Sequence, residues 1–194
     1  MAESIAAIFN MTLDMLDESK VVSSPDDDTA AARLLNRNYT QTRDEVLSAF
    51  PWRFAMSRSS IASTTTPSFG WDYAYAFPTE ALRVIPPTID GEWEGVPIPH
   101  EIEGRVILAD KAPPLKIRWI KRVEDVTLFT PLFTRAVAAK LATYVSHRFV
   151  GKQSYTERMI RIYDATIEEA RRVDSLQGTP QRAEQDDWLR SRYG

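Results

Sequence analysis

The sequence contains no cysteine and only two histidines, His100 and His147, among its 194 residues. Without cysteine the chain can form no disulfide, offers no thiol nucleophile and cannot hold zinc through thiolates. A chain without cysteine is also compatible with a reducing cytoplasm. Because one imidazole does not make a metal site, we interpret each histidine as a surface or packing residue.

Long apolar runs and basic runs are equally scarce. No apolar stretch approaches the roughly 20 residues that span a bilayer, and the opening MAESIAAIFN carries Glu3 and no lysine or arginine. We therefore expect no membrane span and no secretion signal. The formal net charge is −3 and the pI about 5.5, so we expect no sequence-independent grip on a phosphate backbone.

Catalytic motifs are missing too, since the sequence has no GxSxG, HExxH or GxGxxG. Two clusters of carboxylates could carry chemistry. Glu92 and Glu94 flank Trp93, as in paired-carboxylate glycoside hydrolysis, and Glu101 and Glu103 follow His100, which a carboxylate could turn into a general base. Short acidic turns and wet loops explain such clusters more simply. We therefore expect no catalytic, cofactor-binding or metal-binding residue and no enzyme.

Apolar residues recur at helical spacing near both ends of the chain and predict four helices, over about residues 4–17, 26–49, 131–150 and 154–176. The Asp26–Asp28 run lacks the rest of a calcium-binding loop and suits the positive end of the second helix. The expected N-caps and first turns are Ser4, Ser24 with Pro25, Thr130 with Pro131, and Ser154. The expected packing residues are Phe133, Val137, Leu141 and Tyr144 in the third helix and Tyr163 and Ile167 in the fourth.

Prolines and strand-like patterns set residues 52–128 apart. Most of the 12 prolines lie between residues 51 and 131, and WDYAYAF, ALRVI, RVILA and LKIRWIKR have strand-like lengths and patterns. We expect a small antiparallel sheet or sandwich with prolines at its edges and turns. Its predicted core contains Trp71, Tyr73, Tyr75, Phe77 and Trp119. The first four would form the packed face of the first long strand of this region, which Pro78 ends.

Together these patterns predict an α+β fold. Residues 1–51 and 129–176 would form a helical bundle, residues 52–128 an inserted antiparallel β-rich domain, and residues 177–194 an extended C-terminal tail. The tail has few residues that could hold it to a core, yet it ends with the residue types that are enriched at interface hot spots. We interpret Trp188, Leu189, Arg190, Arg192 and Tyr193 as docking residues.

Several stretches, in this order, resemble the tail tubular protein A family of short-tailed bacteriophages: FPWRFAMSRSSIA, WDYAYAFPTEALRVI, PLFTRAVAAKLATYVSHRF, IYDATIEEARRVD and WLRSRY. The resemblance covers roughly residues 45–193. The family's Y-x-Y-x-x-P segment is matched by Tyr73, Tyr75 and Pro78, and its L-R-V strand by Leu82, Arg83 and Val84. Its alanine-rich helix is matched by Phe133 with residues 136–141, and its Ala-Arg pair by Ala170 with Arg171. One departure lies between these motifs: the family usually has an acidic or polar residue after Y-x-Y-x-x-P and then a cysteine or similar small residue before L-R-V, whereas this chain reads TEALRV, with Ala81 at the last of these positions.

The resemblance implies a head-to-tail adaptor of the virion neck, assembled in the host bacterial cytoplasm. Twelve copies would form a ring between the portal protein and the tail nozzle, and DNA would pass through the lumen without specific binding. The helical part would pack against neighbouring copies and the portal, and the β-rich part would point to the tail. The C-terminal tail would dock on the portal. Adaptors of long-tailed phages and gene-transfer particles have a similar helical part.

Two other functions stay open on the residues alone. A monomeric phage-encoded binding module or assembly factor would be absent from finished particles. A hydrolase that uses Glu92, Glu94, Glu101 and Glu103 would lose turnover when they are replaced, whereas an adaptor would still assemble.

Overall fold

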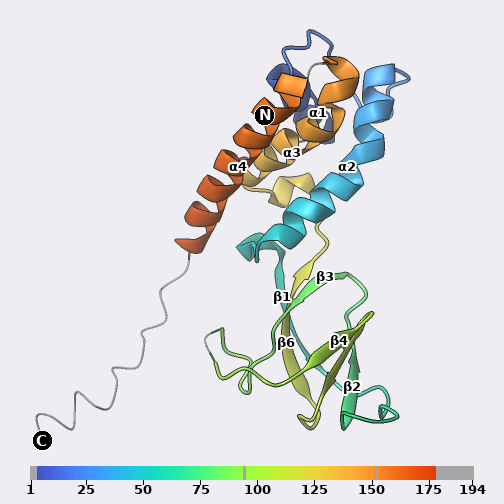
Figure 1. Cartoon of the computed structure of the whole chain (residues 1–194), viewed down its shortest axis with the longest axis vertical. Helices are drawn as coiled ribbons and strands as arrows, with labels where there is room; N and C mark the ends of the chain where they lie inside the picture. Colours follow the sequence, from blue (N-terminus) through green and yellow to red (C-terminus); the bar gives the residue numbers. More distant parts are fainter. Residues whose placement is uncertain (1–3, 94, 152, 178–194) are drawn as a thin grey trace, which may run out of the picture.

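The computed structural model of the chain describes residues 4–93, 95–151 and 153–177. In these residues, four α-helices form a bundle at one end of a long molecule and six β-strands lie at the other (Figure 1). The predicted α+β class is confirmed, with two small antiparallel sheets. The bounds are α1 Ile5–Met15, α2 Ala30–Ala49, η1 Arg53–Ala55, β1 Met56–Ile61, β2 Tyr73–Ala76, β3 Ala81–Ile85, β4 Glu101–Glu103, β5 Val106–Ala109, β6 Leu115–Lys121, η2 Val126–Leu128, α3 Pro131–Phe149 and α4 Gln153–Ser175.

Two of the predicted helix starts are confirmed. The Ser4 hydroxyl accepts a hydrogen bond from the Ala7 N–H at 3.1 Å and caps α1. Thr130 caps α3 by accepting from the Phe133 N–H at 3.3 Å, and Pro131 is the first helical residue. Both hydroxyls satisfy an N–H that has no partner inside the helix.

The predicted start of the second helix is wrong, because α2 begins at Ala30 rather than near residue 26. Its N-cap is Thr29, whose hydroxyl accepts from the Ala32 N–H at 3.1 Å. The Asp27 carboxylate accepts from the N–H groups of Ser23 and Ser24, at 2.7 and 3.0 Å, and so closes a separate turn before the helix. The Asp26–Asp28 run therefore precedes the helix.

The turn between α3 and α4 contains Gly151, which takes a φ of +69° and donates its N–H to the His147 carbonyl. This left-handed position is favourable for glycine and ends α3. The predicted cap of the fourth helix is wrong, since Ser154 lies inside the first turn of α4, which begins at Gln153.

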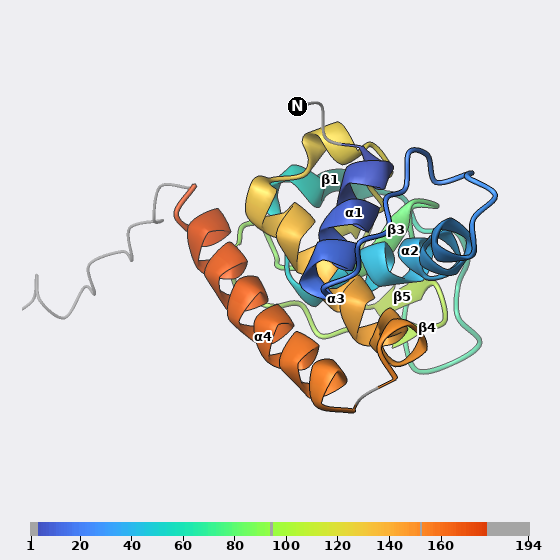
Figure 2. The ribbon, with the colours of Figure 1, turned by 90° about the horizontal axis from the view of Figure 1, so that it is seen from above.

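Helix α3 is the centre of the bundle. It packs against α1, α2 and α4, and Figure 2 shows α4 on one side of α3 and α2 on the other. Four alanines of α3 are fully buried and let the neighbouring helices come close. The Thr12 hydroxyl of α1 even reaches the backbone carbonyl of Ala138, at 3.3 Å. The alanines are Ala136, Ala138, Ala139 and Ala142.

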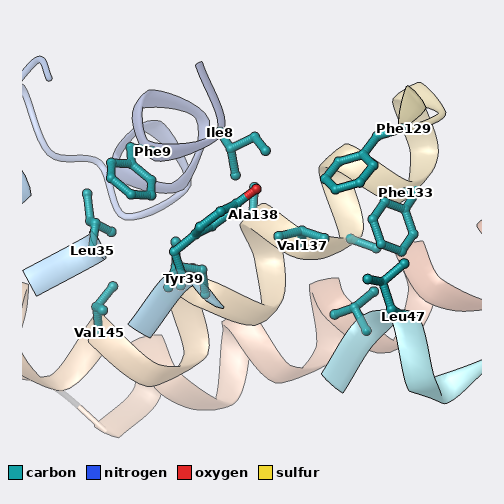
Figure 3. Close-up of a cluster of buried hydrophobic side chains, with 14 of the residues drawn as sticks. Ile8, Phe9, Leu35, Tyr39, Leu47, Phe129, Phe133, Val137, Ala138 and Val145 are labelled. Carbon is teal, nitrogen blue, oxygen red and sulfur yellow. The ribbon is translucent and has the colours of Figure 1, made fainter. Parts of the chain in front are cut away.

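The helical core buries the predicted packing residues of α3 (Figure 3). Phe133, Val137 and Leu141 are fully buried, and Ile167 of α4 is 4% exposed. Tyr163 is only partly buried at the edge of this core. Tyr144 was expected in the same stripe, but it is 45% exposed. Its position in the helix turns the ring toward α2 and α4, outside the core.

The strands form two three-stranded sheets, in the orders β1-β6-β3 and β2-β5-β4. Residues on one face of each sheet meet in a second core. Leu115, Ile117 and Trp119 alternate along β6 and all point into it, as the period of two predicts. Among the described residues, no helix is long and apolar enough to cross a membrane.

The expectation for the alternating aromatic residues holds only in part. Their strand, β2, is the second of the region rather than the first, and its four residues exclude Trp71 and Phe77. Tyr75 is fully buried, whereas Tyr73 and Phe77 are partly buried at the edge of the second core. Trp71 lies outside this core and donates its indole N–H to the Glu101 carboxylate at 3.2 Å.

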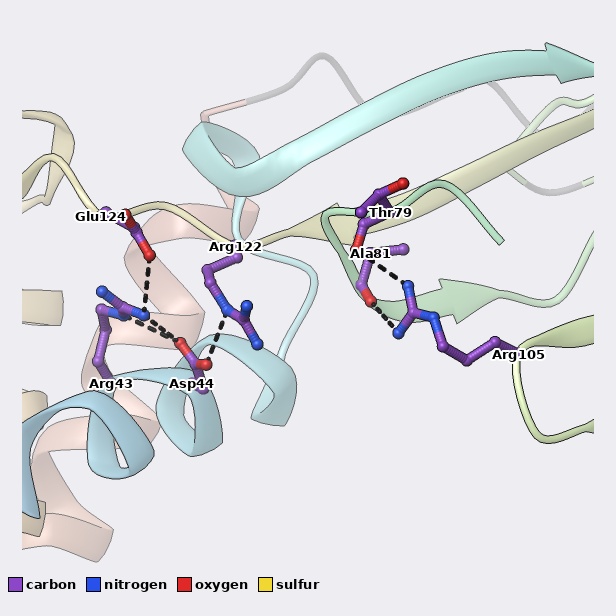
Figure 4. A network of polar contacts seen from close by, with 7 residues as sticks. All are labelled: Arg43, Asp44, Thr79, Ala81, Arg105, Arg122 and Glu124. Atoms are coloured by element: carbon purple, nitrogen blue, oxygen red, sulfur yellow. Dashed lines mark hydrogen bonds and ion pairs between the residues drawn. The ribbon is translucent and has the colours of Figure 1, made fainter. Parts of the chain in front are cut away.

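Pro78 does end the aromatic segment and turns the chain into the next strand. Its carbonyl accepts from the Ala81 N–H at 2.9 Å, and β3 begins at Ala81. The Arg105 guanidinium holds the turn with bonds of 3.1 Å to the Thr79 carbonyl and 3.2 Å to that of Ala81 (Figure 4). It also donates to the Pro78 carbonyl at 2.8 Å.

Candidate assembly surfaces

An ionic contact fastens the sheets to the helices where the chain leaves β6. Asp44 of α2 accepts from Arg122 Nε at 2.9 Å and pairs with Arg43 Nη2 at 2.8 Å (Figure 4). Arg43 is 5% exposed, and the carboxylate of Glu124 lies 3.7 Å from it. A buried guanidinium needs a partner charge to offset its lost hydration. This cluster therefore fixes the end of β6 against α2.

A second contact fastens the chain just before β1. The Asp174 carboxylate, near the end of α4, accepts from the Arg53 backbone N–H, with oxygens at 3.1 and 3.3 Å. Arg53 Nε donates in turn to the Asp174 carbonyl at 3.1 Å. Burial raises the pKa of the Asp174 carboxyl, and the Arg53 N–H and charge offset part of that effect. The two sheets are thus tied to the bundle at both chain crossings.

One flank of the bundle combines aromatic, apolar and charged side chains from three helices. We call it the aromatic flank: Glu45 of α2, Lys140 and Tyr144 of α3, and Ile160 and Tyr163 of α4. The Lys140 ammonium lies 5.3 Å from the Tyr144 ring centroid and 5.0 Å from that of Tyr163. Both Tyr144 and Ile160 are 45% exposed. Such a mixture is typical of protein–protein contact surfaces.

Glu45 holds Tyr144 in place on this flank. The phenol donates a hydrogen bond to the Glu45 carboxylate. That hydrogen bond, with partial burial and the carboxylate charge, raises the pKa of Tyr144 to about 12. The same hydrogen bond orients the phenol ring toward α2.

The predicted docking residues of the C-terminal tail, Trp188, Leu189, Arg190, Arg192 and Tyr193, lie outside the described residues. The last described residues, Leu176 and Gln177, follow α4 directly, and Leu176 is 73% exposed. The tail thus leaves from the end of α4 beside the Asp174 contact.

The described carboxylates that could have carried catalysis, those of Glu92, Glu101 and Glu103, are exposed. Glu101 and Glu103 are exposed on β4, and Glu101 accepts from Trp71. Glu92 is 3.5 Å from Arg118 Nη2, beside a cavity of about 10 Å³. That volume holds about one water molecule and no sugar. Glu94 lies outside the described residues.

The two histidines lie in ordinary surroundings. His100 Nδ1 is 2.8 Å from the Ile98 carbonyl, and His147 is exposed near the end of α3. Within the described ranges, no group of three or more histidine or acidic side chains could hold a metal ion.

No family model matches the chain, and a search of curated proteins finds no match either.

Sequence reasoning missed the contacts that join the two ends of the molecule. Arg122 and Asp44 are separated by 78 positions, and Arg53 and Asp174 by 121. Each of these residues looks like an ordinary surface charge in its own segment. Only Asp174 carries a weak indication, because an acidic residue near the negative end of a helix is unfavourable unless something else stabilises it.

Proposed function

We propose that the protein is a structural head-to-tail adaptor of a bacteriophage virion. In this proposal, twelve copies form a ring between the portal protein and the tail nozzle in the virion neck and extend the DNA channel. The chain is not an enzyme and uses no cofactor. The sequence resemblance supports this assignment, and the described residues contribute surfaces that suit assembly.

The observation that carries the proposal is a long molecule with two unlike ends. One end is a helical bundle and the other is a pair of small sheets (Figure 1). The contacts of Asp44 with Arg122 and of Asp174 with Arg53 fasten the two ends to each other. A protein that joins two different partners in a line needs two separate surfaces held at a fixed distance, and this architecture supplies them.

The helical end carries the features expected for contacts within a ring and with the portal. The aromatic flank offers the half-exposed Tyr144 beside Lys140. The C-terminal tail follows α4, whose last turn lies beside the Asp174–Arg53 contact where the bundle meets the sheets, and its Trp188, Leu189 and Tyr193 would order on docking to the portal. Large aromatic anchors can offset the entropy lost when such a segment folds on binding.

The charge of the chain suits a channel through which DNA slides. The net charge is −3, and an acidic or neutral lining repels phosphates and keeps DNA from sticking. Tight binding of the free protein to duplex DNA at physiological salt would contradict this part of the proposal.

The tail offers a direct test, in which the portal of the same genome is mixed with the full chain or with a version that ends at Gln177. A full-length variant with Trp188, Leu189 and Tyr193 replaced by serine keeps the length constant and serves as the matched control. We expect only the parent chain to co-sediment with the portal, while all three proteins melt alike. If the truncated chain co-sediments equally, the tail has another role. If no version binds, the adaptor proposal fails and a binding module or assembly factor takes its place.

A further inference from the structure

The loop between β1 and β2, residues 62–72, lies at the end of the molecule farthest from the helices (Figure 1). Strand β1 starts at Met56, which packs on the helical core, and ends at Ile61, which packs in the core between the sheets. The chain therefore leaves β1 pointing away from the bundle. We call residues 62–72 the tip loop.

The tip loop exposes an aromatic side chain to an unusual degree. Phe69 is 89% exposed, the highest value among the large hydrophobic residues that the structure describes. Gly70, which follows it, has a φ of +85°, a left-handed conformation that side chains disfavour. This turn places the phenyl ring at the outside of the loop, where water contacts nearly all of it.

Hydrogen bonds hold the tip loop on both sides of Phe69. Before it, the Thr64 N–H donates to the Ala74 carbonyl at 2.8 Å, and the Ala74 N–H donates to the Thr65 carbonyl at 3.2 Å. After it, the Asp72 N–H donates to the Asp110 carboxylate at 3.0 Å. A loop fixed in this way presents its side chain with little further entropy to lose on binding.

The acidic residues around the tip loop favour a protein partner over an anionic membrane. Asp72 bonds Asp110 and Trp71 bonds Glu101 there, and these three acidic residues are exposed, as is the neighbouring Lys111. An acidic rim is repelled by the anionic surface of a membrane, and one ring buries too little apolar surface to hold a protein on lipid. The same rim complements a protein pocket that is apolar inside and basic at its edge.

We propose that Phe69 anchors the β end of the protein in an apolar, basic-rimmed pocket of a tail-side protein. This inference rests on the proposed function, because that function assigns the β end to the tail. It goes further by naming the side chain that binds and the chemistry of the site that receives it. The aromatic ring supplies the contact area, and Asp72 and Asp110 orient the loop toward the cations of the rim.

The test uses the full chain, the portal and the tail nozzle protein of the same genome. Phe69→Ser removes the anchor, and Val96→Ser is the matched control, since Val96 is 65% exposed in the same β-rich part but outside the tip loop. Because both side chains face water, both variants should melt like the parent. The readouts are ring formation on the portal, affinity for the nozzle, and binding to vesicles that contain phosphatidylserine.

We expect Phe69→Ser to weaken nozzle binding by at least about tenfold, as for a hot-spot residue, and to leave portal rings unchanged. Val96→Ser should stay within about twofold of the parent for both. Equal nozzle binding by Phe69→Ser and the parent overturns the inference, as does a parent that binds no nozzle. Vesicle binding that depends on Phe69 would show that the phenyl group contacts lipid rather than the nozzle, and it would also overturn the inference. A parent that forms no portal ring, yet binds the nozzle through Phe69, would overturn the proposed function and leave the tip contact standing.

Discussion

Tyr75 and Tyr73 are two positions apart on β2 but differ in burial. Tyr75 is fully buried in the core between the sheets and donates its hydroxyl to the Lys111 carbonyl, whereas Tyr73 is only partly buried. We expect Tyr75→Ala to lower the free energy of unfolding by about 3 kcal/mol, near the low end for large aromatic residues. Tyr73→Ala should cost about half as much. Urea denaturation measures both values, and equal losses would contradict this account of the core.

Neither tyrosine should affect binding to the portal at temperatures where the variants are folded. Both residues lie in the sheets, away from the helical end. If Tyr73→Ala melts like the parent but fails to assemble, then this face of β2 is an interface rather than part of the core.

Asp174 makes the stability of the protein depend on pH in a defined direction. Burial raises the pKa of its carboxyl above the ordinary value of 3.8. The protonated form therefore contributes stability that is fully present below the unfolded pKa and is lost as pH rises through the folded pKa. Asp174→Asn lacks this dependence while its amide oxygen can still accept from the Arg53 N–H.

We therefore expect the stability of Asp174→Asn relative to the parent to increase as pH rises from 3.8 through the folded pKa of Asp174, and then to stay constant. Chemical denaturation of both proteins across this range gives the difference directly. A difference that falls with rising pH would mean that the carboxylate is stabilised in the fold rather than disfavoured by burial.

At the level of elements, the start of α2 can be tested with two single substitutions. Thr29→Ala removes the observed N-cap, and we expect it to lower the free energy of unfolding by about 1 kcal/mol. Ser24→Ala removes a hydroxyl that accepts only from the nearby Asp26 N–H, at 3.2 Å, so its effect should be smaller. Urea denaturation of the two variants measures both changes in the free energy of unfolding. A larger decrease for Ser24→Ala than for Thr29→Ala would indicate that the helix begins near residue 26, with Ser24 as its N-cap.

The same helix shows why the sequence predicted the elements better than their starts. Ser24, Pro25 and three aspartates satisfy several of the rules for a helix N-terminus: an N-cap hydroxyl, a first-turn proline and acidic residues in the first turn. In the structure the Asp27 carboxylate instead closes a local turn by accepting from the N–H groups of Ser23 and Ser24. The helix therefore begins after the next hydroxyl residue, Thr29, which is its N-cap. Both Ser24 and Thr29 could cap the helix, and the sequence pattern does not contain the backbone geometry that selects Thr29.

Side-chain period served well where burial is one-sided and poorly elsewhere. It correctly predicted Trp119 of β6 as a core residue, on the face that also carries Leu115 and Ile117. It failed for Trp71, because the alternating pattern begins in the loop before β2, where the indole donates to Glu101 instead of packing in the core. Tyr144 likewise fits the stripe of α3 but turns outward to bond Glu45.

At the scale of the whole molecule, the candidate sites follow from arrangement rather than from motifs. The aromatic flank draws residues from three helices, and the contacts that join the two ends link distant segments. Neither the aromatic flank nor these contacts could be predicted from local sequence patterns, because such patterns do not show how one element packs on another. The proposed division of labour, with the helices toward the portal and the tip loop toward the tail, is a property of this long shape.

Electron microscopy of the full chain mixed with the portal of the same genome tests the central claim most directly. We expect a ring added to one end of the portal only, with the helical ends of the copies against the portal and the sheets forming the far rim. A portal that gains no density over a range of salt and pH would contradict the adaptor proposal. A ring attached through its sheets would contradict the assignment of the two ends.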